Sequence, residues 1–177
     1  LIIAFATLVV LFSGVQIMAQ FFPGVILQIM YRYYAFQANV AEKTVVIDGY
    51  EIPYYRGGEG PTLVLVHGFG DSKISFLQSA AHLTTEYDVI MLDVPGFGDT
   101  EQQDSRSYSI RHQAETLHKF LTKLELGPVF LAGNSMGGHI SAALTLMHPD
   151  QIQKLILINA AGLRVDDPVP YKPSEAP

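Results

Sequence analysis

Ser135 stands in the run Gly-Asn-Ser-Met-Gly at 133–137, which has the G-x-S-x-G spacing of a nucleophilic serine on a sharp turn. A strand-like apolar run precedes this segment and a helix-like run follows it. Glycine two positions to either side lets the strand and the helix pass close together. The pattern predicts that Ser135 attacks a carbonyl carbon and that the backbone N–H of Met136 stabilises the resulting oxyanion.

Two further apolar runs end in turns. The run 62–66 is followed by His67-Gly68-Phe69-Gly70, and the backbone N–H of Phe69 is the second candidate oxyanion donor. His67 itself is interpreted as a structural hydrogen-bonding residue. The run 89–92 leads through Asp93 into a Pro-Gly turn. Three strand-to-turn units in this order are much harder to obtain by chance than one pentapeptide.

The periodicity of the chain predicts an α/β fold. Strands alternate with helices, which favours a mostly parallel sheet with helices on both faces. The first two strands are expected to form an antiparallel hairpin around Asp48-Gly49. The expected strands are 44–47, 51–56, 62–67, 89–93, 129–134 and 154–159, and the expected helices are 74–85, 109–125 and 136–148.

The motifs H-G-F-G, D-x-P-G-x-G and G-x-S-M-G-G resemble those of the α/β-hydrolase superfamily over about residues 44–165. Within it, the chain is most similar to membrane-anchored monoacylglycerol lipases and bacterial lipases and esterases. Three details favour the lipases within this superfamily: Lys73 after H-G-F, the S-M-G-G-H run, and the Ala-Gly-Leu at 161–163. The resemblance implies a serine hydrolase of carboxylic esters, such as monoacylglycerols, that works through an acyl-enzyme without a cofactor.

A serine hydrolase of this fold needs an acid and a histidine base after the serine in sequence. Only His139 and His148 follow Ser135. His139 is expected to point along the helix that follows the elbow, and His148 to cap that helix, so neither is expected to be the base. The proline-rich residues 166–177 are typical of a linker into a lid. We therefore expect a fragment, inactive alone, whose acid and base lie outside this chain.

The N-terminal residues 1–31 carry no charge. About 20 apolar residues span a bilayer as a helix, so residues 1–30 are predicted to be a transmembrane and interfacial anchor, with the membrane helix at about 1–22. A juxtamembrane linker is expected at 31–43, the hydrolase core at 44–165 and the start of the lid linker at 166–177. A removable signal peptide and a buried helix are the alternatives. The charges that follow the anchor do not determine which side of the membrane the core occupies.

Composition narrows the possible partners and functions. The net charge is −6 and only 16% of the residues are charged, which disfavours nucleic acid as a partner. There is no cysteine, and the six histidines lack metal-ligand spacing, so no thiolate nucleophile and no metal site are expected. The expected partners are a lipid or small ester and a membrane. Two other functions remain open: a carbon-carbon bond hydrolase of ring-cleavage products, and a non-catalytic membrane-tethered scaffold.

Overall fold

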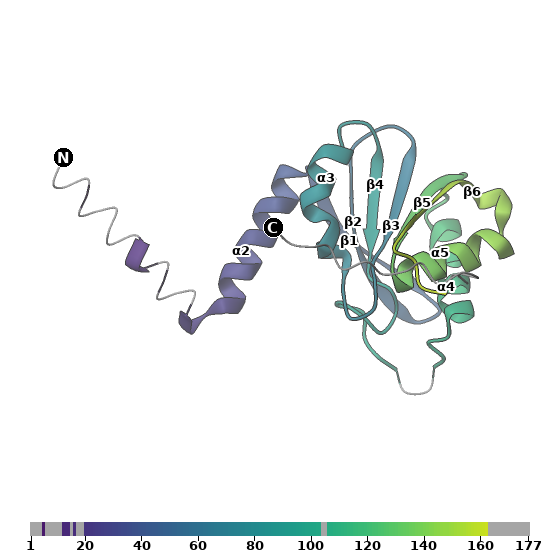
Figure 1. Ribbon diagram of the computed structural model, residues 1–177, viewed down its shortest axis with the longest axis horizontal. Coiled ribbons are helices and arrows are strands. Elements are labelled where there is room, and N and C mark those ends of the chain that lie inside the picture. Colours follow the sequence, from purple (N-terminus) through teal and green to yellow (C-terminus); the bar gives the residue numbers. More distant parts are fainter. Residues whose placement is uncertain (1–4, 6–11, 15, 17–19, 104–105, 163–177) are drawn as a thin grey trace, which may run out of the picture.

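The computed structural model describes residues 5, 12–14, 16, 20–103 and 106–162, and these form a six-stranded sheet with helices on both sides (Figure 1). The strands are β1 (Val40–Ile47), β2 (Tyr50–Gly57), β3 (Thr62–Val66), β4 (Asp88–Leu92), β5 (Val129–Asn134) and β6 (Ile152–Ile158). The helices are α2 (Pro23–Gln37), α3 (Leu77–Leu83), α4 (Ile110–Lys123) and α5 (Met136–Met147), with short 3-10 turns η1 (Lys73–Phe76) and η2 (Pro149–Gln151).

The order of strands across the sheet is β1-β2-β4-β3-β5-β6. The four strands β3 to β6 run parallel, and β1 and β2 form an antiparallel hairpin that pairs with β4. Parallel neighbours need long crossovers, and α3, α4 and α5 supply them. Asp48 and Gly49 form the hairpin turn with positive φ values of 50° and 80°. The predicted mostly parallel sheet is confirmed.

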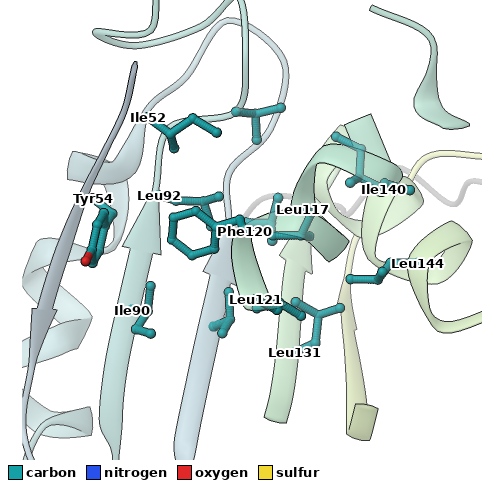
Figure 2. Close-up of a cluster of buried hydrophobic side chains, with 14 of the residues drawn as sticks. Ile52, Tyr54, Ile90, Leu92, Leu117, Phe120, Leu121, Leu131, Ile140 and Leu144 are labelled. Carbon is teal, nitrogen blue, oxygen red and sulfur yellow. The ribbon is translucent and has the colours of Figure 1, made fainter. Parts of the chain in front are cut away.

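Alternate residues along the central strands face different helices. Val64 and Val66 of β3 pack in the core beneath α4 and α5, whereas Leu63 and Leu65 pack beneath α3. Figure 2 shows the first of these clusters, with Phe120 of α4 at its centre. The central strands are therefore buried on both faces, which explains why they are continuously apolar in sequence.

The chain before the sheet differs from the expected linker at 31–43. Helix α2 continues to Gln37, and β1 begins at Val40, so this stretch holds the end of a helix and the start of a strand. The helix continues because Tyr31, Tyr34 and Ala35 lie on one face and pack against the core beneath α3. No helix in the described part of the chain is both long enough and apolar enough to cross a membrane. Most of the predicted membrane helix at 1–22, and the expected lid linker at 166–177, lie outside the described residues.

Candidate active site

Ser135 lies at the junction of β5 and α5 in a backbone conformation that residues other than glycine rarely adopt. Its φ is 51° and its ψ is −115°. The surrounding backbone holds this conformation: the N–H of Ser135 donates to the carbonyl of Ile158 at 3.0 Å, and the carbonyl of Ser135 accepts from Gly138 at 3.1 Å and Ala161 at 2.9 Å. Such strain costs on the order of 1–3 kcal/mol and persists only where neighbours enforce it. The end of β6 and the first turn of α5 therefore present Ser135 at the tip of a turn.

The glycines around Ser135 are required by close packing. A Cβ atom on Gly133 would overlap the carbonyl oxygen of Gly137, and a Cβ atom on Gly137 would overlap that of Val66. The helix thus approaches both its own strand and β3 more closely than any side chain allows. This is the physical reason predicted for the glycines of the motif.

The loop after β3 lies beside Ser135. A Cβ atom on Gly68 would be 3.3 Å from the Cβ atom of Ser135. The carbonyl oxygen of Gly68 accepts hydrogen bonds from Nδ1 of His67 at 2.8 Å and from the N–H of Asp71 at 3.4 Å. The peptide bond between Gly68 and Phe69 is trans. The C=O and N–H bonds of a trans peptide point in opposite directions within one plane, so the N–H of Phe69 points away from the carbonyl oxygen of Gly68. Within the described residues, that N–H donates to no protein acceptor.

The imidazole of His67 is buried and both of its nitrogens are engaged. Nε2 accepts from the N–H of Val94 at 3.0 Å, so the proton must be on Nδ1, which donates to Gly68. Burial lowers the pKa of His67, which keeps the ring neutral. His67 therefore ties the ends of β3 and β4 together and is unavailable as a base, in agreement with its structural interpretation.

A buried ion pair joins the loops that follow the same two strands. Asp93 Oδ2 accepts from Lys73 Nζ at 2.9 Å and from the N–H of Asp99 at 2.9 Å, while Oδ1 accepts from the N–H of Lys73 at 2.6 Å. Burial alone would lower the pKa of Lys73, but hydrogen bonds to Asp99 and Asp93 raise it far above its ordinary value. A Cβ atom on Gly98 would overlap the Asp93 carboxylate.

Sequence reasoning treated Lys73 only as a family detail and Asp93 only as the end of a strand, and missed that they form a pair. The available signal was an aspartate placed directly after one strongly apolar strand and a lysine in the loop that follows another. A charge in such surroundings is rarely buried without a partner.

The two histidines that follow Ser135 are engaged elsewhere. The ring of His139 lies against Gly162 in the loop after β6. The ring of His148 stacks on that of His118, with centroids 3.6 Å apart. In the part of the chain that the structure describes, no side chain hydrogen-bonds to the hydroxyl of Ser135, and no cluster of three or more acidic, histidine or cysteine side chains could hold a metal ion.

The arrangement offers a serine hydroxyl beside two backbone N–H groups. Met136 is the first residue of α5, and its N–H, like that of Phe69, donates to no protein acceptor among the described residues. The side chain of Phe69 is 77% exposed and packs edge-on against Phe97 at 5.2 Å between centroids. Free N–H groups beside a serine hydroxyl are an arrangement that acyl transfer can use.

Comparisons with known proteins agree with this geometry. Residues 61–176 match the family described as alpha/beta hydrolase fold. The chain is 29% identical over 147 residues to monoacylglycerol lipase ABHD6 of Bos taurus, covering 80% of this chain and 44% of the lipase. It is 33% identical over 137 residues to a 2-hydroxy-6-oxo-6-(2'-aminophenyl)hexa-2,4-dienoic acid hydrolase of Metapseudomonas resinovorans, covering 73% and 46% of the two chains.

A crystal structure of a membrane phospholipase A, described as a bacterial virulence factor, superimposes with a TM-score of 0.78 at 37% identity. The match covers 93% of this chain and 54% of that structure. The chain thus spans less than half the length of the two curated relatives named above.

Proposed function

This chain belongs to the α/β-hydrolase fold family, and we propose that its Ser135 is the nucleophile of a serine hydrolase that cleaves carboxylic esters. The single observation that carries the proposal is the strained Ser135 at the tip of the β5–α5 turn, beside the Gly68–Phe69 peptide. The proposed substrates are monoacylglycerols or related lipid esters.

In this proposal the Ser135 hydroxyl attacks the ester carbonyl and forms an acyl-enzyme, which water then hydrolyses. The N–H groups of Phe69 and Met136 stabilise the oxyanion, and one such donor is typically worth about 3–4 kcal/mol. The N–H of Phe69 needs little reorientation during the reaction, because His67 already fixes the Gly68–Phe69 peptide plane. The proposal assigns the acid and the histidine base to residues outside this chain.

The lipid class is supported by the relatives and by the N-terminal segment. Two of the proteins that this chain resembles are a monoacylglycerol lipase and a membrane phospholipase A. Residues 1–31 carry no charge, and the described aromatic residues Phe5, Phe12, Phe21 and Phe22 are exposed. We propose that this segment holds the enzyme at a membrane as a single-pass anchor, where substrates dissolved in the bilayer reach it.

A carbon-carbon bond hydrolase is the second candidate, because one relative at 33% identity is a dienoic acid hydrolase. It would use the same serine and the same oxyanion donors. Turnover of a vinylogous diketone without turnover of monoacylglycerol would select it instead.

The test is monoacylglycerol hydrolysis by the full-length protein and by its Ser135→Ala variant. The expected loss in kcat is at least about a thousandfold, since a nucleophile removed from a triad costs more than that in known serine hydrolases. Ser79→Ala is the matched control, since Ser79 lies exposed on α3. Ester hydrolysis retained by Ser135→Ala would refute the proposal.

A further inference from the structure

A cleft of about 490 Å³ lies where α2 meets the sheet. Gln28, Tyr31 and Arg32 of α2 line one side of it, and Glu42 of β1, Tyr55 of β2 and Asp99 line another. These residues come from four separate segments of the chain. The cleft therefore exists only because α2 packs against the core.

Charged side chains around Lys73 form the floor of the cleft. The Lys73 ammonium donates hydrogen bonds to Asp93 at 2.9 Å and Asp99 at 2.6 Å, and it forms an ion pair with Glu42 at 3.3 Å. Lys73 and Asp93 are buried, whereas the side chains of Glu42 and Asp99 are 52% and 76% exposed. Three carboxylates face this one ammonium, so the two exposed carboxylates present uncompensated negative charge to a cationic ligand group on that side of the cleft.

The α2 side of the cleft carries donors. Arg32 is the only charged residue of α2, and within the described residues its guanidinium forms no ion pair and no hydrogen bond. Over the same ranges the side chains of Gln28, Tyr31 and Tyr55 also form no hydrogen bond. A guanidinium opposite two carboxylates matches a ligand that carries an anion and a cation on one short chain.

An apolar surface adjoins the cleft. Outside the cleft-lining positions, α2 exposes the large side chains of Val25, Leu27, Ile29, Met30 and Phe36. At 100° per residue these side chains are distributed around the exposed circumference of α2, next to the cleft. The polar cleft and the neighbouring apolar side chains of α2 therefore suit the two ends of one amphiphilic molecule.

We propose that this cleft binds the headgroup of a zwitterionic phospholipid, with the phosphodiester at Arg32 and the ammonium at Glu42 and Asp99. Tyr55 supports the contact with the ammonium, because aromatic rings attract cations. The ring centroid of Tyr55 already lies 5.8 Å from the Lys73 ammonium. The inference goes beyond the proposed hydrolysis: the site contains neither Ser135 nor its oxyanion donors, and binding there does not require the lipid to be cleaved.

The test measures binding of glycerophosphocholine to the full-length protein in a non-ionic detergent, by calorimetry. Arg32→Ala is expected to weaken binding about tenfold or more, the usual cost of losing a hydrogen bond to a charged group, while Arg32→Lys retains part of it. Glu42→Gln should weaken the binding of glycerophosphocholine and should not weaken the binding of inorganic phosphate, because a negative charge is removed from the cleft. The matched control is Arg111→Ala, which removes an exposed arginine from α4 on the opposite face of the sheet.

Three results would overturn the proposal. Unchanged binding in a folded Arg32→Ala variant would exclude the cleft. Inorganic phosphate bound as tightly as glycerophosphocholine would show a simple anion site. Failure of phosphatidylcholine vesicles to displace bound glycerophosphocholine would show a site for soluble phosphodiesters and not for lipid. Because none of these measurements uses ester hydrolysis, their outcome is independent of the proposal for Ser135.

Discussion

The imidazole Nδ1 of His67 lies 2.8 Å from the carbonyl oxygen of Gly68, and the peptide that it fixes is the one that carries the N–H of Phe69. The opposite nitrogen of the same ring accepts from Val94 at 3.0 Å. One neutral side chain thus orients the loop beside Ser135 and joins it to the end of β4. This arrangement works only while His67 is unprotonated, because a second ring proton would face the N–H of Val94.

The protonation of His67 predicts a pH-dependent stability. Its pKa in the folded protein is lowered by burial, whereas in the unfolded chain it is about 6.5. As the pH falls below about 6.5, the unfolded state binds the proton first, so the free energy of unfolding decreases until the pH reaches the folded pKa. Urea unfolding between pH 8 and pH 5 should show this decrease. The decrease should be smaller in His67→Gln. It should be unchanged in His82→Gln, which alters an exposed histidine of α3. An equal decrease in all three proteins would contradict the neutral, buried state assigned to His67.

Removing the charge of Lys73 should strongly destabilise the protein. Lys73→Met leaves the buried Asp93 carboxylate without its cation, and breaking a buried pair from one side costs about 3–5 kcal/mol. Chemical denaturation measures the loss. Lys123→Met, at the exposed end of α4, should change the free energy of unfolding by less than about 0.5 kcal/mol. A similar small effect for both variants would mean that the Lys73 pair contributes little.

A methyl group should be tolerated at one glycine and not at another. Gly137→Ala places a Cβ atom into the carbonyl oxygen of Val66, which α5 can relieve only by moving away from the sheet. Gly127 has no neighbour within 4 Å of the corresponding position. Thermal unfolding should show a large loss for Gly137→Ala and a change within about 0.5 kcal/mol for Gly127→Ala. Normal stability of Gly137→Ala would contradict the close packing at the elbow.

The backbone strain at Ser135 predicts that glycine is favoured there. Relief of strain is worth on the order of 1–3 kcal/mol, and the greater freedom of glycine in the unfolded chain offsets about 0.5–1 kcal/mol of it. Ser135→Gly should therefore be more stable than Ser135→Ala, by on the order of 1 kcal/mol. At Ser79, within helix α3, the order should reverse, since alanine is the better helix former by about 1 kcal/mol. The same order at both sites would argue against strain at Ser135.

The sheet and the elbow could be predicted because their signals are local. Strands buried on both faces are continuous apolar runs, so β3, β4 and β5 were placed within about a residue of their observed ends. The turn at Ser135 is encoded by its flanking glycines. The strand expected at 44–47 begins earlier, at Val40, because it is an outer strand whose polar residues Glu42 and Lys43 give no apolar pattern.

Long-range pairs of residues and helix α2 could not be predicted from local sequence patterns. An interfacial segment, and no separate helix, was expected from the sequence at 23–37. Pro23 is the first residue of α2, where its missing N–H costs nothing. The pairing of Lys73 with Asp93, 20 residues apart, depends on the parallel order of β3 and β4. Only the assembled sheet brings these two loops together.

The central claim is that Ser135 is an activated nucleophile, and reaction of the full-length protein with a fluorophosphonate tests it most directly. The account predicts one covalent adduct, found by mass spectrometry on the peptide that contains Ser135, present in Ser79→Ala and absent in Ser135→Ala. No adduct on the folded full-length protein, or an adduct that persists in Ser135→Ala, would contradict the account and favour the non-catalytic scaffold.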